Sequence, residues 1–217
     1  MRLKPSDIGH RSIQINGFYE LALTRQITTL ARSGGMLVDA GANYGYFSIL
    51  WLANNPANRC VAFEAAPGNT PALQDNIQRN GLSERIQVET MALSDQTGWV
   101  DFIPEDTGGQ TGWGGITRQA LAGSIRVPAT TLGQYWIKHY PGQHIAVLKI
   151  DVEGADTLVL QGARHLLAQQ QIRHIFFEIN RPRMHLLGLD EFQAQELLES
   201  YGYKVEQTDV HERHAYW

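Results

Sequence analysis

The chain has 217 residues, of which 43% are hydrophobic and 18% are charged, and its formal net charge is −4 at pH 7. This length and composition predict a single globular domain, residues 1–217, and exclude a disordered chain. The small negative charge and the lack of a run of basic residues exclude a typical nucleic-acid-binding surface, so we expect no nucleic-acid partner.

The cysteine content and the apolar segments indicate where the protein works. Cys60 is the one cysteine of the sequence and lies in the apolar segment CVAF, which predicts a buried free thiol in a reducing compartment. The N-terminal residues lack the apolar region of a signal peptide, and no segment approaches the roughly 18 apolar residues of a membrane span. We therefore expect a cytoplasmic protein without a membrane partner, either a monomer or a homo-oligomer.

Segments typical of helices and strands alternate along most of the chain. Residues 18–33 carry apolar side chains at helical spacing before Gly34 and Gly35, which predicts a helix within an N-terminal helical segment, residues 1–35. Strands and helices then alternate, which is typical of an α/β fold with right-handed crossovers and a parallel sheet. The predicted strands are residues 36–41, 59–67, 86–94, 145–154, 172–180 and 204–210, and the predicted helices are residues 44–56, 70–81, 155–170 and 190–203.

The alternation is interrupted between residues 97 and 128. Two segments with strand character, residues 98–106 and 124–132, flank the sequence TGGQTGWGG, which has five glycines in nine residues. This pattern predicts an inserted β-hairpin, about residues 97–128, with a mobile tip at residues 107–115. The tip either folds over a substrate as a lid, with Trp113 near its centre, or is a surface loop without such a role.

A glycine-rich loop follows the first predicted strand, in the sequence VDAGANYGYF at residues 38–47. Gly41 and Gly45 allow main-chain N–H groups to approach a ligand at the carboxyl end of the strand. A dinucleotide fingerprint would have a second glycine where this chain has Asn43, so a pyrophosphate is poorly accommodated. Asp39 would repel a diphosphate but can pair with an ammonium group, directly or through water. The loop therefore predicts S-adenosylmethionine, which carries an ammonium group and no phosphate.

Glu64 closes the second predicted strand, 25 residues after Asp39. An acid in this position accepts hydrogen bonds from ribose hydroxyls, so Glu64 predicts an adenosine ribose; the alternative is an exposed acid at a strand end. NAD would use the same acid, which leaves an NAD-dependent oxidoreductase as a less favoured alternative. A second alternative is a protein that binds S-adenosylmethionine without catalysis.

Charged side chains gather at the end of the strand AVLKIDVEG. Lys149 and Asp151 lie on one side of this strand because side chains alternate, and Glu153 follows them. Glu178 and Asn180 share one face of the next strand in the same way. These residues predict a polar pocket in which Asp151 or Glu153 deprotonates or polarises a hydroxyl group. The alternative for Lys149 is a structural salt bridge.

A divalent metal is a less favoured variant of this site. Asp151, Glu178 and Asn180 offer three oxygen ligands from adjacent strand ends, which would suit Mg²⁺, but Lys149 would compete for the carboxylates. We therefore predict no metal. The downstream histidines are expected at the surface or in packing, and they are His165, His174, His185, His211 and His214.

Five motifs in this order resemble the FkbM family of S-adenosylmethionine-dependent methyltransferases, over about residues 36–180. They are VDAGANYGYFS at 38–48, FEAAPGN at 63–69, NGL with MALSDQTG at 80–98, LKIDVEGAD at 148–156 and FFEIN at 176–180. The resemblance implies a Rossmann-like class I methyltransferase fold, with a mostly parallel seven-stranded sheet and helices on both faces. It also implies methyl transfer to a hydroxyl group of a sugar, a polyketide or another small secondary metabolite.

The resemblance also implies roles for particular residues. The glycine-rich loop would hold the methionine part of the cofactor, Glu64 the ribose, and Met91 and Ala92 would lie against the adenine. The residues around the methyl group and the acceptor would be Lys149, Asp151, Glu153 and Glu178. The chain departs from the family pattern at Gly133, where members commonly carry an acidic residue after the sequence TTL, so no helix-cap or substrate role is predicted there.

Overall fold

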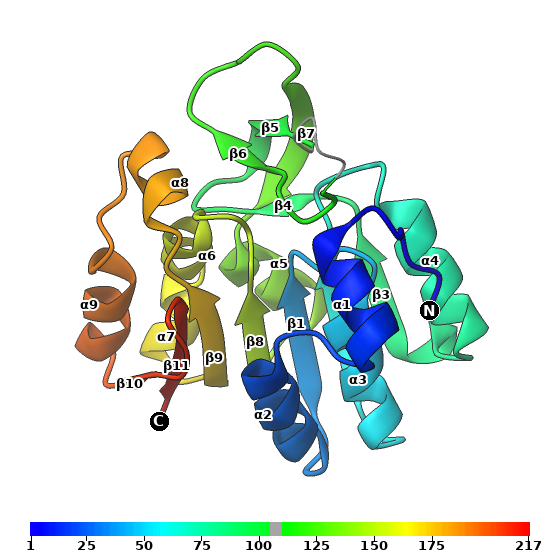
Figure 1. Cartoon of the computed structure of the whole chain (residues 1–217). Helices are drawn as coiled ribbons and strands as arrows, with labels where there is room; N and C mark the ends of the chain where they lie inside the picture. The colour runs from blue at the N-terminus through cyan, green and yellow to red at the C-terminus, as the bar shows by residue number, and fades with distance from the viewer. Residues whose placement is uncertain (105–109) are drawn as a thin grey trace.

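The structure, a computed structural model, describes residues 1–104 and 110–217. At its centre lies a seven-stranded sheet with the strand order β10-β11-β9-β8-β1-β2-β3 (Figure 1). The strands from β9 to β3 run parallel, and β11 runs antiparallel to both β9 and β10. The strands are β1 (Met36–Ala40), β2 (Arg59–Phe63), β3 (Ile86–Glu89), β8 (Ile145–Ile150), β9 (Ile172–Glu178), β10 (Lys204–Gln207) and β11 (Glu212–Tyr216). The predicted α/β fold with a mostly parallel seven-stranded sheet is therefore confirmed.

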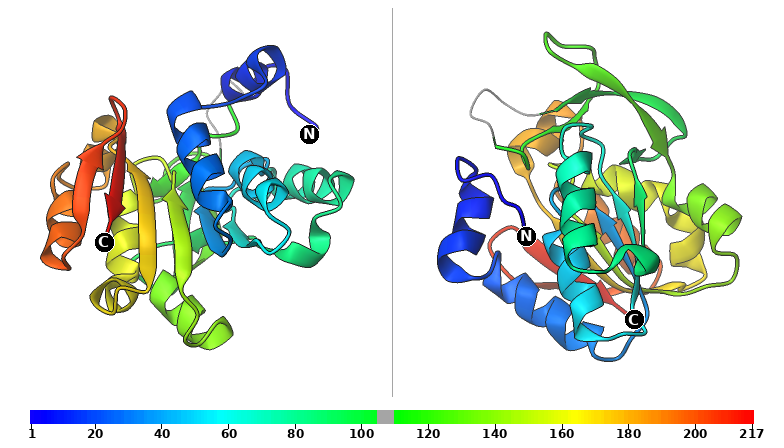
Figure 2. Two further views of the ribbon diagram at one scale, coloured as in Figure 1. Left: turned by 90° about the horizontal axis from the view of Figure 1, so that it is seen from below. Right: turned by 90° about the vertical axis from the view of Figure 1, so that its right-hand side faces the viewer.

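Helices cover both faces of this sheet, as predicted (Figure 2). Successive side chains of a buried strand point to opposite faces, so Val38 of β1 packs with the helices of one face and Leu37 with those of the other. The first face carries α5 (Leu132–His139), α6 (Asp156–Gly162), α7 (Arg164–Ala168) and α9 (Gln193–Ser200), and the second carries α2 (Leu21–Ala31), α3 (Tyr46–Asn54) and α4 (Thr70–Arg79). The shorter elements are α1 (Ile8–Asn16), α8 (Arg181–Leu186) and the 3₁₀ helix η1 (Ser83–Arg85). In the part of the chain that the structure describes, no helix is long and apolar enough to cross a membrane.

Two predicted strands differ from the structure. The predicted strand 86–94 is divided, because β3 ends at Glu89 and β4 (Ala92–Leu93) pairs with the inserted segment instead. The predicted strand 204–210 is the shorter β10, and β11 follows it. The sequence ERHAY of β11 has one buried side chain, Ala215, so it lacks the apolar alternation by which a strand is recognised.

The inserted segment forms a second sheet that is larger than the predicted hairpin. β5 (Gly98–Ile103) and β7 (Ile125–Thr130) pair antiparallel as a hairpin would, and β4 and β6 (Gly115–Thr117) extend them to the order β4-β7-β5-β6. This sheet lies above the carboxyl ends of the parallel strands (Figure 1) and turns Phe102 inward. Residues 105–109 include part of the predicted tip and lie outside the described residues, so the lid remains a prediction.

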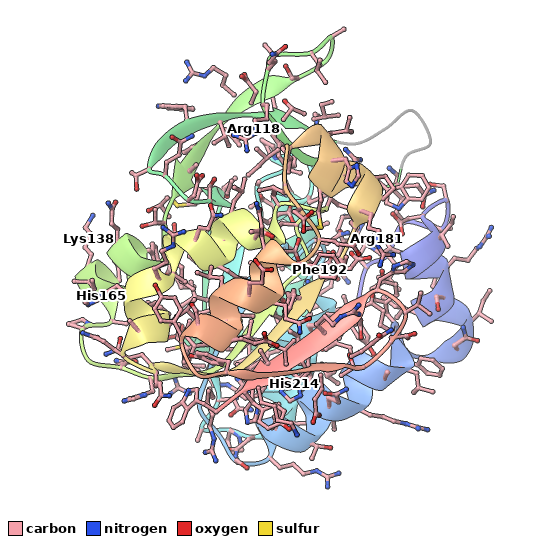
Figure 3. All side chains as sticks on the ribbon, turned by 90° about the vertical axis from the view of Figure 1, so that its left-hand side faces the viewer. Arg118, Lys138, His165, Arg181, Phe192 and His214 are labelled. Atoms are coloured by element: carbon pink, nitrogen blue, oxygen red, sulfur yellow. The ribbon has the colours of Figure 1, made fainter. Side chains whose placement is uncertain are left out.

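A pair of histidines joins β9 to β11. His174 Nδ1 and His214 Nε2 lie 3.0 Å apart, and the ring of His214, which is labelled in Figure 3, stacks on Phe176 with 4.3 Å between the ring centroids. Burial lowers the pKa of both histidines, that of His214 to about 4, and the charge of Arg173 adds to the shift of His174. Both rings are therefore neutral at pH 7, and one donates a hydrogen bond to the other.

This pair is expected to lose its stabilising effect as the pH falls from about 6.5 toward 4. The unfolded chain binds protons at an ordinary histidine pKa near 6.5, and the folded chain does so only at lower pH. Between pH 7.5 and pH 5, the free energy of unfolding of wild type should therefore fall by about 1–2 kcal/mol more than that of His214→Phe. Urea unfolding at the two pH values measures this difference. His185→Phe, at an exposed histidine, is the control. Equal pH dependence of wild type and His214→Phe would contradict the prediction.

Candidate active site

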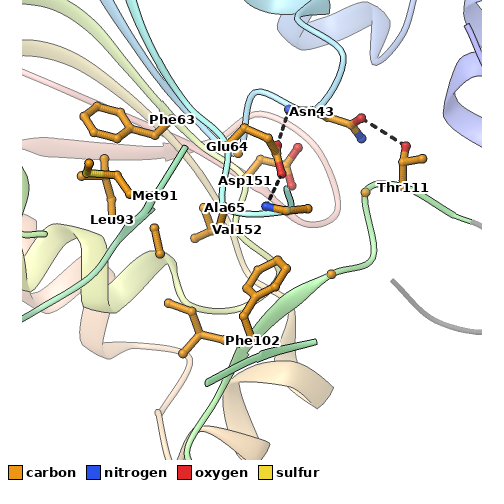
Figure 4. A pocket seen from close by; sticks show the side chains of 16 residues that line it. Asn43, Phe63, Glu64, Ala65, Met91, Leu93, Phe102, Thr111, Asp151 and Val152 are labelled. Carbon is orange, nitrogen blue, oxygen red and sulfur yellow. Dashed lines mark hydrogen bonds between the residues drawn. The ribbon is translucent and has the colours of Figure 1, made fainter. Parts of the chain in front are cut away.

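A cavity lies where β1 and β2 end, between the glycine loop (residues 41–45), the segment after β3 and the inserted sheet (Figure 4). Its walls are mostly apolar, and its polar groups gather at one end. The apolar lining includes Phe63, Met91, Ala92, Leu93, Phe102 and Val152, and the polar lining includes Asn43, Glu64, Thr111 and Asp151. Five predicted cofactor residues border this cavity, namely Gly41, Asn43, Glu64, Met91 and Ala92. An apolar slot with a carboxyl group at its end suits an adenosine.

Glu64 is buried at the polar end of the cavity. Its Oε2 accepts a hydrogen bond from the Asn43 main-chain N–H at 2.7 Å, and its Oε1 accepts one from the Ala66 N–H at 2.8 Å and one from the Asn69 side chain at 3.3 Å. Burial raises the pKa of Glu64 to about 7, although these hydrogen bonds oppose the shift. Glu64 therefore fixes the glycine loop against β2, and it lines the cavity with one acceptor position still free, as the predicted contact with a ribose requires.

Nearby protein atoms leave no room for a side chain at the two glycines of the loop. Gly41 has a φ of +77°, and a Cβ atom there would lie 1.9 Å from the Asp151 carbonyl oxygen. Gly45 has a φ of +86°, and a Cβ atom there would lie 2.6 Å from Leu73 Cδ1. The sequence predicted that both glycines make room for a ligand; in the structure, Gly41 borders the cavity but both residues are glycine because the loop packs closely on β8 and α4.

Gly41→Ala is expected to destabilise the protein and to weaken cofactor binding, because the loop must move away from Asp151. Gly123→Ala is a matched control, since Gly123 has a φ of +85° but no atom within 4 Å of the added Cβ. The free energy of unfolding should be about 1–3 kcal/mol lower in Gly41→Ala than in Gly123→Ala, because the clash adds to the effect of the positive φ that both share. Urea unfolding of the two variants measures this difference. Equal stability of the two variants would contradict this account.

Lys149 lies at the centre of a buried group of charges. Its Nζ is 3.3 Å from Asp39 Oδ1 and 3.3 Å from Asp151 Oδ2, and it donates a hydrogen bond to the Gly41 carbonyl oxygen at 3.0 Å. Burial opposes its charge, but Asp39, Asp151 and Glu20 outweigh this effect and raise the pKa of Lys149 above its ordinary value. The ammonium group thus has three acceptors within the protein, which favours the structural salt bridge over a catalytic role.

This arrangement corrects the prediction for Asp39. Its side chain is fully buried, with Oδ2 accepting a hydrogen bond from the Ser48 hydroxyl at 2.6 Å and Oδ1 facing Lys149. A direct contact with the ammonium group of a ligand is not available in this geometry, because protein atoms cover the carboxylate and Lys149 supplies its counter-charge. The preference for S-adenosylmethionine over NAD therefore no longer rests on Asp39.

A second hollow, the crevice, continues from this first cavity between α1, α2 and α8. Its lining includes Tyr19, Glu20, Trp113, Asp151, Glu153, Glu178, Asn180 and Arg183. The side chain of Asp151 is 33% exposed and borders both hollows. Burial raises the pKa of Glu153 to about 8 and that of Glu178 to about 7, and the charge of Asp151 adds to both shifts. The three acids predicted for catalysis therefore lie in one region, with Lys149 behind them.

Sequence reasoning missed the residues that the N-terminal segment brings to the site. Tyr19 and Glu20 border the crevice, but an acid directly before a helix reads as an ordinary helix start. Asp7 accepts hydrogen bonds from the Thr111 N–H at 2.7 Å and the Thr111 hydroxyl at 3.0 Å, and this hydroxyl lies 3.1 Å from Asn43 Oδ1. The described part of the inserted tip is thereby held between α1 and the glycine loop.

The alternative metal ligands have other partners. Asn180 donates to Glu153 Oε2 at 2.9 Å and accepts from the Arg183 N–H at 3.3 Å, while Asp151 faces Lys149. Among residues 1–104 and 110–217, no group of three or more His, Cys, Asp or Glu side chains is arranged to hold a metal ion. Binding without a metal remains a prediction.

The strand order, with one antiparallel strand beside β9, and a cavity over β1 and β2 define the class I methyltransferase fold. Methyltransferase FkbM from Methylobacillus flagellatus KT shares it with a TM-score of 0.58 and 16% identity, over 85% of this chain and 44% of that one. SAH-bound methyltransferase PaMTH1 from Podospora anserina shares it with a TM-score of 0.51 and 10% identity, over 90% of this chain and 77% of that one. The model of the methyltransferase FkbM domain matches residues 39–205, so the chain belongs to the FkbM family.

One relative of the chain is named for an O-methylation activity. The 2-O-methyltransferase NoeI of Sinorhizobium fredii (strain NBRC 101917 / NGR234) is 25% identical over 184 residues, which covers 76% of this chain and 72% of NoeI. The chain thus spans most of NoeI but less than half of the Methylobacillus structure.

Proposed function

We propose that this chain transfers a methyl group from S-adenosylmethionine to a hydroxyl group of a small-molecule acceptor. The observation that carries this proposal is the junction of the first cavity, the cofactor cavity, with the crevice. Gly41, Asn43 and Asp151 border both hollows. A donor in the first and an acceptor in the second would meet beside Asp151, and such positioning supplies much of the rate of a bimolecular transfer.

The residues of the cofactor cavity fit this donor. The apolar walls suit the adenine, and Glu64 stands where ribose hydroxyls would donate hydrogen bonds. Asn43, in the place of a dinucleotide glycine, has its side chain beside the Thr111 hydroxyl, which disfavours a diphosphate there. Membership of the FkbM family and the SAH bound to the Podospora neighbour support the same donor. When bound, S-adenosylmethionine supplies a methyl group on a positively charged sulfur, which is a good leaving group.

The crevice side chains would bind and orient the acceptor. The Asp151 carboxylate, held by Lys149, would accept a hydrogen bond from the acceptor hydroxyl, and the neighbouring carboxyl groups would take up its proton. The described part of the inserted tip, which borders both hollows, would limit the access of water.

Among hydroxyl acceptors we favour a sugar over a polyketide or another metabolite. Trp113 is 45% exposed at the rim of the crevice, so an aromatic face is available for a sugar ring. Several carboxyl groups below it can accept hydrogen bonds from neighbouring hydroxyls. The 2-O-methyltransferase activity in the name of NoeI supports transfer to oxygen.

Calorimetry with S-adenosylmethionine, S-adenosylhomocysteine and NAD tests the donor before any acceptor is known. We expect the first two to bind and NAD not to bind. Binding of NAD alone would favour the oxidoreductase. Binding of S-adenosylmethionine without methyl transfer to any sugar, polyketide or phenol in a broad panel would favour a non-catalytic binding module.

A further inference from the structure

Glu20 stands directly before α2 with a backbone conformation that few residues adopt. Its φ is 42° and its ψ is 74°, in the left-handed region, and its side chain makes no capping hydrogen bond to the helix. Four non-glycine residues of the described chain have a positive φ, and three of them, Glu20, Asn43 and Glu153, border the cofactor cavity or the crevice. Such strain persists where the surrounding structure imposes it, often at functional sites. Here it places the Glu20 side chain in the crevice.

Titratable groups from three elements face Glu20. The Tyr19 hydroxyl faces its carboxyl group from the preceding residue, Lys149 and Asp151 face it from the end of β8, and Glu212 faces it from β11. Burial raises the pKa of Glu20 to about 8; Asp151 and Glu212 add to the shift, and Lys149 opposes it. A carboxylate whose pKa lies near the working pH accepts a proton far more readily than an ordinary one.

The other acids of the crevice are less suited to this task. One carboxylate oxygen of Asp151 lies 3.3 Å from the ammonium group of Lys149 and is occupied by that ion pair. Glu153 accepts the hydrogen bond from Asn180, and Arg183 adds a positive charge nearby. Glu178 borders the outer part of the crevice, toward α8 and β11, whereas Glu20 also borders the part beside the glycine loop.

We propose that Glu20 is the general base that removes the proton from the acceptor hydroxyl. This inference rests on the proposed function and assigns its proton transfer to the N-terminal segment, residues 1–35. In the step, the acceptor oxygen bonds to the methyl carbon while the carbon–sulfur bond breaks, and the electron pair of that bond remains on sulfur. The hydroxyl proton passes to the Glu20 carboxylate, which releases it to water before the next turnover.

The test compares wild type with Glu20→Gln and Glu20→Asp, using S-adenosylmethionine with a tritiated methyl group and a panel of methyl glycosides. Glu20→Gln should lower kcat at pH 8 by about 100-fold or more, and Glu20→Asp should lower it less. The affinity for S-adenosylhomocysteine in calorimetry should stay within about twofold of wild type, which separates loss of the base from loss of the fold or of the cofactor site. Glu196→Gln, on the exposed surface of α9, is the matched control and should leave kcat unchanged.

The pH dependence provides a readout that a structural role would not change. The rate of wild type should rise with pH through a midpoint well above the ordinary carboxyl pKa, and this rise should be absent in Glu20→Gln. Glu212→Gln removes a like charge that faces Glu20, so it should shift the midpoint to lower pH.

Two results would overturn the inference, and they are distinguishable. An active wild type with an equally active Glu20→Gln of unchanged pH profile overturns the assignment of Glu20 and leaves the proposed function intact. A wild type that binds S-adenosylhomocysteine but methylates no glycoside, polyketide or phenol overturns the proposed function, and the base with it.

Discussion

Replacement of Lys149 with methionine is expected to lower the free energy of unfolding by about 3–5 kcal/mol. Methionine is similar in shape and fills most of the same space, so the main effect is electrostatic. The substitution leaves the Asp39 carboxylate fully buried without its counter-charge and removes the hydrogen bond to the Gly41 carbonyl. Urea unfolding at pH 7.5 measures the effect, and cofactor binding should weaken with it because the glycine loop loses its anchor.

Two further variants separate this explanation from a general effect of losing a lysine. Lys204→Met removes an exposed ion pair with Glu206, and the unfolding midpoint should stay close to that of wild type. Adding Asp39→Asn to Lys149→Met removes the unpaired charge and should restore part of the stability. A loss below about 1 kcal/mol in Lys149→Met would contradict a structural role for the buried charges.

Glu64→Gln is expected to weaken the binding of S-adenosylmethionine and S-adenosylhomocysteine by about 10- to 100-fold, because a hydrogen bond to a charged group contributes roughly 1.5–3 kcal/mol. Glutamine keeps the size of the side chain but replaces one acceptor oxygen with a donor. Calorimetry measures the effect, and Glu84→Gln, at an exposed acid of η1, is the control.

The affinity for the cofactor is also expected to depend on pH through Glu64. Burial raises the pKa of Glu64 to about 7, and ribose hydroxyls donate to the charged carboxylate. Affinity in wild type should therefore be full at pH 8 and fall as the pH drops through 7 toward 5.5, whereas Glu64→Gln should show no such change. Affinity in Glu64→Gln within about twofold of wild type at pH 8 would remove Glu64 from the cofactor site.

The sequence was sufficient to predict those parts of the site that depend on one strand at a time. Apolar runs located the parallel strands, and the rule that ligands bind at their carboxyl ends brought Glu64, Asp151 and Glu178 to one edge of the sheet. The structure places all three there, around the two connected hollows. The positions of these residues were predictable because strand direction and side-chain alternation follow from local sequence, whereas their roles stay predictions.

Contacts between distant segments were not predictable from one sequence. Asp39 pairs with Lys149 because the two residues lie directly opposite each other on β1 and β8, and no local pattern encodes that register. Glu20 reaches the crevice through the packing of α2, which its own sequence does not show. The break after β3 was missed because Ala92 and Leu93 are apolar enough to continue a strand, yet they pair with β7 of the second sheet.

The contact between Asp7 and Thr111 has a consequence for engineering. Residues 104 positions apart meet through buried hydrogen bonds, which link the start of α1 to the inserted segment. A chimera that receives residues 97–128 from another methyltransferase without the matching N-terminal helix would leave the Asp7 carboxylate buried without its hydrogen-bond donors at Thr111. Transplanting acceptor selectivity between relatives should therefore require both segments together.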